Sequence, residues 1–515
     1  MRGDFQNEPL LDFTVPENRE RMKSALSQVR AEFGKEYTII IGDDEITTSD
    51  KIHSVNPSKK GEVVGVCQRG TVREAEKAID VAGQAFESWR WKSAEDRARI
   101  LFRASEIMKE RRFELDALMV YEVGKNWVEA DADFAEAIDF LEFYGREALR
   151  YSKPRPLVRI PTEENELKYI PLGIGVVIPP WNFPLAILVG MTSASVVSGN
   201  AVVLKPSSDS PVMGAVFTEI FREAGLPAGV LNLVTGGGGQ IGDYLIEHPM
   251  TRFIAFTGSM EVGLRINELA AKARPGQIWI KRVIAEMGGK DSIIVDNEAE
   301  IEKAVEGVVT SAFGFQGQKC SACSRAIVHQ DVYDEVVEKI VDRTNRITVG
   351  PTEIPENYMG PVINGVAEET ILGYIERGRK EGNLLVGGDK VSDEGYFINP
   401  TVIADVSPDA VIAQEEIFGP VLAVIKARDF EDALTIANNT VYGLTGSVYT
   451  TNKEKIDKAR DWFHCGNLYF NRKCTGALVG VHPFGGFNMS GTDSKAGGPD
   501  YLMLFTQAKC ISSVS

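Results

Sequence analysis

The chain has 515 residues, 43% hydrophobic and 25% charged, which is usual for a folded globular protein of roughly two to four domains. Asp and Glu number 73 against 56 Lys and Arg, so the net charge is −17. A charge of this sign repels nucleic acid and anionic membrane surfaces, and we expect a small-molecule substrate and neither of those partners. The six cysteines are too few for a disulfide scaffold, and the first residues show no secretory leader; both features favour the cytoplasm.

The first third of the sequence is predicted to be helical. Thr71 with Glu74 and Ser93 with Asp96 have the spacing of capping boxes, and apolar residues at helical intervals follow each pair. Helical spacing continues over residues 99–123 and 134–149, and a proline-rich, charged segment at 151–169 is predicted to be an extended ribbon or linker.

Residues 169–204 contain no charged side chain and are long enough to cross a bilayer. Pro179 and Pro180 interrupt this stretch, and a spanning helix would lose backbone hydrogen bonds there with no water to replace them. We therefore interpret the stretch as a buried strand at 174–178, a loop, a packed helix and a second buried strand at 201–204.

From this point, short apolar runs alternate with helical segments in two successive sets. The alternation predicts an α/β protein with parallel sheets, in which ligands bind at the carboxyl ends of the strands. A second α/β domain is predicted from about residue 287. The predicted strands are 174–178, 201–204, 230–234 and 252–257 in the first set and 292–295, 325–328 and 421–425 in the second, which also has helices at 301–313 and 332–346.

The C-terminal segment, residues 490–515, ends in a run of alternating apolar and polar residues over 501–511. A strand without a neighbour is rarely stable. We expect this tail to add a strand to the sheet of a partner subunit.

Two glycine-rich turns follow predicted strands, and each suits a phosphate group. Residues 237–242 have the letters G-x-G-x-x-G of a dinucleotide fingerprint, with Glu261 lying 19 positions beyond. Gly258, Ser259 and Gly263 open a helix, where free N–H groups and the Ser hydroxyl can bind an anion. A flexible turn and a capped helix start explain the same letters, so the pattern alone does not choose between the two turns.

Cys320 lies in a polar, glycine-rich loop beside Lys319. A cysteine next to a cation can have a lowered pKa and act as a thiolate nucleophile, whereas a structural cysteine usually lies within an apolar run. Local context leaves these interpretations evenly matched. Cys320-x-x-Cys323 also has the spacing of a metal or redox pair, but no second ligand pair accompanies it, and we predict no metal site.

Glu286 and Asn182 are two further candidates for chemistry. Glu286 ends an apolar run before the double glycine at 288–289, where burial would raise its pKa and leave a base able to activate water. Asn182 stands between Pro180 and Pro184, so that its amide is a rigidly held donor. The alternative role of this amide is to fix its own loop.

Taken together, these segments resemble the aldehyde dehydrogenase superfamily. The resemblance covers most of the chain, because seven motifs occur in family order. They are Pro180-Trp181-Asn182-Phe183-Pro184, Lys205-Pro206-Ser207-Ser208, Phe256-Thr257-Gly258-Ser259, Glu286-Met287-Gly288-Gly289-Lys290, the loop around Cys320, Glu415-Glu416-Ile417-Phe418-Gly419-Pro420 and Pro483-Phe484-Gly485-Gly486.

The resemblance implies an NAD-dependent oxidation of an aldehyde. Cys320 would be the nucleophile and Glu286 the base that hydrolyses the thioester, while Asn182 and the Cys320 N–H would hold the oxyanion. NADP remains possible, because Ser208 stands where many NAD-restricted members have a Glu. The residues implied for the cofactor are Lys205 and Glu416 on the ribose hydroxyls, Gly258 and Ser259 at the pyrophosphate, Phe418 at the nicotinamide end, and Trp181 and Ser208 beside them.

The loop at 315–321 and the turn at Gly476 and Ala477 resemble those of a subgroup that oxidises L-glutamate γ-semialdehyde in proline or arginine breakdown. In that subgroup, backbone groups of the turn and the Ser after the nucleophile, here Ser321, bind the amino-acid end. Phe183 and Phe484 complete the implied substrate set. Alternatives are another semialdehyde such as succinic semialdehyde and, in a different class, a catalytically silent scaffold protein on this fold.

The resemblance also implies how the chain is divided. We expect a Rossmann-like NAD domain over 1–150 and 170–286 and an α/β catalytic domain over 287–489. Oligomerisation elements at 151–169 and 490–515 would build a homo-oligomer based on a dimer.

Overall fold

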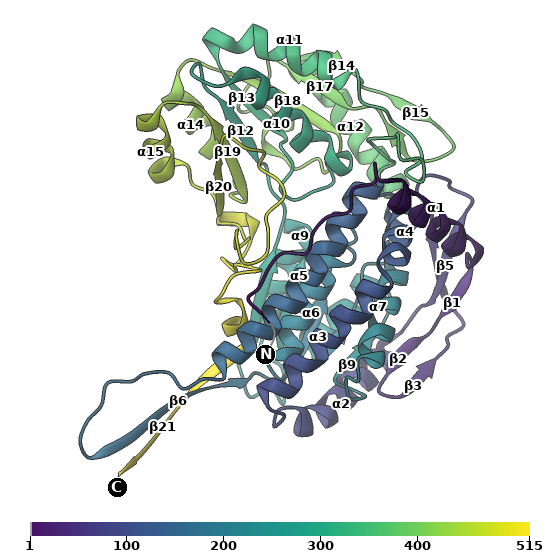
Figure 1. Cartoon of the computed structure of the whole chain (residues 1–515), viewed down its shortest axis with the longest axis vertical. Coiled ribbons are helices and arrows are strands. Elements are labelled where there is room, and N and C mark those ends of the chain that lie inside the picture. Colours follow the sequence, from purple (N-terminus) through teal and green to yellow (C-terminus); the bar gives the residue numbers. More distant parts are fainter. Residues whose placement is uncertain (1–2, 515) are drawn as a thin grey trace.

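The computed structural model describes residues 3–514, which form two lobes, each built on a seven-stranded sheet (Figure 1). The sheet of the lower lobe in Figure 1 is parallel except for β2, which is antiparallel to both of its neighbours. In sheet order its strands are β11 (Arg282–Glu286), β10 (Thr251–Thr257), β7 (Ile174–Ile178), β8 (Ala201–Leu204), β9 (Leu231–Leu233), β2 (Ile39–Ile41) and β3 (Asp44–Ile46).

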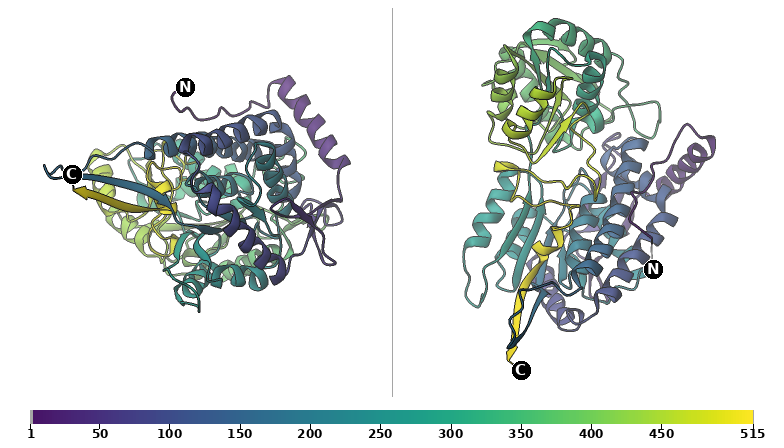
Figure 2. Two further views of the ribbon diagram at one scale, coloured as in Figure 1. Left: turned by 90° about the horizontal axis from the view of Figure 1, so that it is seen from below. Right: turned by 60° about the vertical axis from the view of Figure 1, so that its left-hand side comes forward.

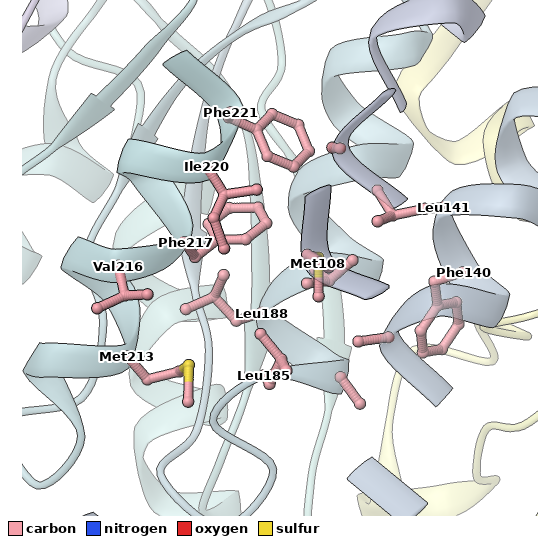
Figure 3. Packing of buried hydrophobic residues seen from close by; sticks show 14 of the residues in the cluster. Met108, Phe140, Leu141, Leu185, Leu188, Met213, Val216, Phe217, Ile220 and Phe221 are labelled. Carbon is pink, nitrogen blue, oxygen red and sulfur yellow. The ribbon is translucent and has the colours of Figure 1, made fainter. Parts of the chain in front are cut away.

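The strands of this sheet are apolar throughout because helices cover both faces. In β8, Val202 and Leu204 join the core that helices α3 to α7 build, whereas Ala201 and Val203 join a second core beneath α2. Such a strand cannot show the polar alternation of a half-exposed sheet. Figure 3 shows the first of these cores, where α7 side chains such as Phe217 and Phe221 face those of α3, α5 and α6.

Nine helices of the described residues belong to this lobe. The second of them begins with the predicted capping box, in which Thr71 and Glu74 satisfy each other's backbone N–H groups. The helices are α1 (Pro16–Ala31), α2 (Val72–Trp89), α3 (Ala94–Glu110), α4 (Arg112–Val123), α5 (Trp127–Tyr151), α6 (Ala186–Val197), α7 (Pro211–Glu223), α8 (Asp243–Glu247) and α9 (Met260–Ala271).

The upper lobe contains the second sheet, which is parallel except for its edge strand β14. In sheet order its strands are β14 (Asn383–Val386), β17 (Thr401–Ala404), β18 (Val421–Ala427), β13 (Arg325–His329), β12 (Ser292–Val295), β19 (Thr445–Tyr449) and β20 (Asn467–Phe470). Its helices are α10 (Ile301–Phe313), α11 (Tyr333–Thr344), α12 (Gly365–Glu381), α13 (Val411–Gln414), α14 (Phe430–Asn438) and α15 (Lys453–Trp462).

The two sets of alternating strands and helices confirm the predicted α/β class with parallel sheets. The charge-free stretch at 169–204 forms β7, a loop, α6 and β8, as predicted. Within residues 3–514, no helix combines the length and apolarity that a membrane crossing requires.

The prediction that the first third is helical is wrong in part. Residues 35–68 contain five short strands, because a three-residue strand such as β2 is too short to reveal a period. The predicted helix over 99–123 is two helices that break at Arg111, although no Gly or Pro marks the break. The strands not yet placed are β1 (Lys35–Tyr37), β4 (Lys51–Val55) and β5 (Val63–Gln68), which form a small sheet, and the pair β15 (Lys390–Ser392) and β16 (Phe397–Ile398).

A two-stranded antiparallel ribbon projects from the lower lobe (Figures 1 and 2). It pairs β6 (Glu163–Pro171) with β21 (Thr506–Val514), so the tail meets the predicted extended segment of its own chain. The predicted alternation over 501–511 is wrong for its first half. Tyr501–Phe505 is a 3-10 helix with three buried apolar side chains, and the strand begins only at Thr506.

Candidate active site

A cavity of about 730 Å³ lies at the carboxyl ends of the lower-lobe strands and faces loops of the upper lobe. β7, β8 and β10 lead directly into its wall, which is where parallel α/β sheets bind ligands. Both glycine-rich turns contribute, through Gly238 and Gly239 and through Gly258. Nine of the predicted site residues line this cavity: Trp181, Asn182, Lys205, Ser208, Gly258, Ser259, Cys320, Glu416 and Phe418.

Lys205 follows β8 and is buried, and desolvation lowers the pKa of its ammonium to about 8. Its Nζ donates to the Pro206 carbonyl at 3.3 Å, which leaves further N–H groups for a ligand. Ser259 caps α9 by accepting a hydrogen bond from the Val262 N–H, so its hydroxyl hydrogen stays available. The N–H of Gly258 donates instead to the Glu286 carbonyl at 3.1 Å.

Glu416 lies across the cavity from these turns, on an upper-lobe loop. Its Oε1 accepts the Gly289 N–H at 3.0 Å, while burial raises the pKa of this carboxyl to about 7. A Cβ at Gly288 would displace the Glu416 carboxylate from this position. The Phe418 ring meets Trp181 edge-on at 5.7 Å and closes this side of the cavity.

Cys320 reaches the cavity from a tight turn that ends α10. Phe315 and Gln316 adopt left-handed backbone angles there, and the Gln316 side chain donates to the carbonyls of Gly124 and Pro361. These long-range bonds hold the loop that carries the thiol.

Lys319 does not lower the pKa of Cys320, an effect that the sequence had left open. The Lys319 ammonium turns to Glu129 on α5, at 2.7 Å, and burial together with the Glu286 charge raises the pKa of the Cys320 thiol well above its usual range. The residue next to a cysteine in sequence need not share its environment, because neighbouring side chains of a loop can point in different directions.

Asn182 and Glu286 both precede this thiol in the sequence. In space, Asn182 contacts the loop that carries the thiol, and the Glu286 charge acts on the thiol itself. The Asn182 amide donates to the Gln318 carbonyl at 3.0 Å, two residues before Cys320, and retains its second hydrogen for a ligand. Glu286 ends β11 outside the cavity wall, and its Oε1 is buried with no hydrogen-bond partner among residues 3–514. Desolvation raises the pKa of this carboxyl to about 8, as its position in the sequence predicted.

The predicted substrate residues lie outside the cavity wall. Cys474 donates its Sγ–H to the Ser321 carbonyl at 3.3 Å, which ties the segment before Gly476 and Ala477 to the nucleophile loop. Gly476 has φ +75°, which favours glycine. Phe183 lies under the buried Lys125 ammonium, and Phe484 forms an isolated bridge to Ala496.

Sequence reasoning missed two acidic residues of the site. Asp209 lines the cavity next to Ser208, and its carboxylate accepts the Asn364 amide at 3.0 Å. Glu136, on α5, contributes its charge to the environment of Cys320 and Glu286. Asp209 adjoins the Lys205 motif and could have been found there, whereas Glu136 lies in an ordinary helix with no local signal.

The fold and this site define the class of protein: the chain belongs to the aldehyde dehydrogenase family, whose sequence profile matches residues 45–511. It is 57% identical over 510 residues to 1-pyrroline-5-carboxylate dehydrogenase of Geobacillus sp. strain WCH70, covering 99% of both chains. Among solved structures, 1-pyrroline-5-carboxylate dehydrogenase from Thermus with bound NAD has a TM-score of 0.99, with 52% identity and full coverage of both chains. Proline utilization A from Bdellovibrio bacteriovorus has a TM-score of 0.98 and 45% identity, over 99% of this chain and 53% of that one.

Proposed function

We propose that this chain oxidises L-glutamate γ-semialdehyde to L-glutamate with NAD, as a 1-pyrroline-5-carboxylate dehydrogenase. The observation that carries the proposal is that Cys320 and Asn182 line the same cavity as the residues expected to bind the cofactor, such as Lys205 and Glu416. The chain is also 57% identical to such an enzyme over 510 residues. The substrate is a small molecule with a charged amino-acid end.

The cavity fits NAD on its own geometry. Lys205 and Glu416 offer a donor and an acceptor for ribose hydroxyls, and Ser259 offers a hydroxyl at a helix N-terminus, where a pyrophosphate is stabilised. When bound, NAD accepts the hydride that leaves the aldehyde carbon. Phe418 and Trp181 would cover the nicotinamide end.

The residues of the chain supply the other steps. The Cys320 sulfur attacks the aldehyde carbon as a thiolate, after the thiol proton has passed to solvent or to a nearby carboxylate. The free hydrogen of the Asn182 amide stabilises the resulting oxyanion. After hydride loss leaves a thioester, Glu286 takes a proton from water, which then hydrolyses the thioester and restores the thiol.

The substrate's amino-acid end is assigned to Ser321 and to the Gly476 turn, which we define as residues 474–480. Within residues 3–514, the backbone N–H groups of Gly476 and Ala477 donate to no acceptor, whereas Arg472 binds the carbonyls of Thr475 and Gly476. Consecutive free N–H groups suit a carboxylate.

The assembly and location complete the proposal. We place the enzyme in the cytoplasm, because the chemistry needs Cys320 as a reduced thiol. We also propose a homo-oligomer built on a dimer, because a ribbon of two strands is marginal in water unless another surface covers it.

Steady-state assays with NAD and NADP test the activity. We expect kcat/KM to be highest for glutamate semialdehyde, lower for succinic semialdehyde and lowest for propanal. C320A should abolish the pre-steady-state burst of NADH, whereas the matched control C510A, on the exposed tail, should retain it. A preference for succinic semialdehyde would overturn the substrate assignment, and a burst in C320A would overturn the nucleophile.

A further inference from the structure

The N-terminal arm, residues 3–15, crosses the helices of the lower lobe in an extended conformation (Figure 1). Two aspartates of α5 fix it there. The Leu11 N–H donates to Asp131 and the Glu8 N–H to Asp139, each at 2.7 Å, and both aspartates are buried. Arg112 reinforces the attachment by bonding Asp131 and the Pro9 carbonyl.

At Asn7 and Phe5 the arm stays on α5 and also reaches the Gly476 turn. The Asn7 amide nitrogen donates one hydrogen to the Asp139 carboxylate, at 2.7 Å, and the other to the Val479 carbonyl, at 3.0 Å. Phe5 packs against Phe143 of α5. Each of these rings has an atom 3.1 Å from the position that a Cβ on Gly480 would take. A single amide thus joins the arm, α5 and the turn.

Other bonds hold the rest of the turn: Arg472 binds the carbonyls of Thr475 and Gly476, and the Leu478 N–H donates to His482. Val479 is buried and lies two residues after Ala477, while Gly480 has φ +76° and donates its N–H to Gly497. A turn with two glycines in left-handed conformations is flexible unless its carbonyls and N–H groups are fixed. The Val479 carbonyl is fixed by a residue 472 positions away in the sequence.

We propose that the N-terminal arm positions the Gly476 turn for the amino-acid end of the substrate, and that Asn7 is the positioning residue. This inference rests on the proposed function, because it concerns the turn that is assigned to the charged end. The arm does not touch the cavity wall, so it should affect neither the cofactor nor the chemistry of Cys320.

The first experiment compares N7A with N18A as a matched control. Asn18 also donates to a backbone carbonyl of the N-terminal region, that of Asp12 at 3.0 Å, but it does not touch the turn. A net hydrogen bond corresponds to roughly a three- to tenfold change in an equilibrium. We therefore expect N7A to raise KM for glutamate semialdehyde by about that factor, with kcat, KM for NAD and KM for propanal unchanged, and N18A to change none of them.

A charge swap separates positioning from simple destabilisation. In the double variant N7D/D139N, the new amide at position 139 can accept the Glu8 N–H and donate to the new carboxylate, so the arm stays docked. The Val479 carbonyl nevertheless loses its donor. We expect the Tm of the double variant to return toward wild type while KM for glutamate semialdehyde stays raised; recovery of both would overturn the proposal.

Hydrogen exchange of the ligand-free protein gives a readout that needs no activity. Amides of residues 474–482 should exchange faster in N7A and in N7D/D139N than in wild type or N18A. Unchanged exchange, or equal KM changes for both aldehydes, would refute the role of the arm. A wild-type enzyme that does not prefer glutamate semialdehyde over propanal would instead refute the proposed function. The exchange rates of residues 474–482 would still test whether the arm positions the turn.

Discussion

The carboxyl of Glu286 has an unusual environment, because its Oε1 is buried without a partner and its pKa is raised to about 8. A group in this state accepts a proton readily once it is ionised. The proposed base therefore loses activity as the pH falls, since protonation removes its acceptor.

The hydrolysis of a preformed thioester should follow this ionisation. We expect its rate to reach a plateau above pH 8 and to fall by about tenfold per pH unit below it, because only the ionised carboxylate activates water. Single-turnover assays from pH 6 to 9 measure this dependence. A flat profile across that range would remove Glu286 as the base.

Replacing the carboxylate should separate the two half-reactions. E286Q should still acylate Cys320 and release NADH once, and then accumulate a thioester that intact-mass measurement detects. An isosteric amide preserves the packing around β11, so a loss of fold is not expected. Full steady-state turnover in E286Q would contradict the assignment.

Asn182 is predicted to act only while negative charge develops on the substrate oxygen. Loss of one oxyanion donor typically costs about 100-fold or more in rate, so N182A should lower kcat by that amount. The Tm of N182A should change little, because the substitution removes only one hydrogen bond, the one to the Gln318 carbonyl. A kcat within threefold of wild type would mean that the amide only fixes its own loop.

At the scale of elements, the turn after β8 bears on the choice of cofactor. Ser208 lacks the charge that repels a 2′-phosphate, but Asp209 places a carboxylate at the next position of the cavity wall. D209N should therefore increase kcat/KM with NADP relative to NAD, because a repulsive charge is removed. The matched control D243N, at a carboxylate already paired with Arg265 at 2.5 Å, should leave the ratio unchanged. An unchanged ratio in D209N would show that Asp209 is too far from the phosphate.

Elements with strong local signals were predictable from sequence, and those without them were not. α7 has Pro211 at its start and Gly225 beyond its end, and β8 is a continuous apolar run. The break at Arg111 has no such signal, because helical spacing continues across it. The direction of Lys319 depends on Glu129, which is 190 residues away, and no local pattern encodes such a contact.

At the scale of the whole molecule, the tail contains two parts that should behave differently when deleted. Removing residues 506–515 takes away only β21, and we expect a folded protein that light scattering shows to be monomeric. Removing residues 500–515 also takes Tyr501 and Phe505 from the core, where loss of one large aromatic side chain costs about 3–5 kcal/mol. That chain should unfold or aggregate by circular dichroism. An active oligomer after deletion of 506–515 would overturn the proposed assembly.

The ribbon of β6 and β21 has a kinetic consequence. Most of the β21 side chains are exposed, so within one chain little except backbone hydrogen bonds opposes its local opening. In the proposed assembly a second subunit covers the ribbon, and the free energy of opening then includes the free energy of association. Its amides should therefore exchange more slowly as the protein concentration rises, while those of β8 do not. The ribbon would thus report, site by site, how much of the protein is dissociated at any dilution.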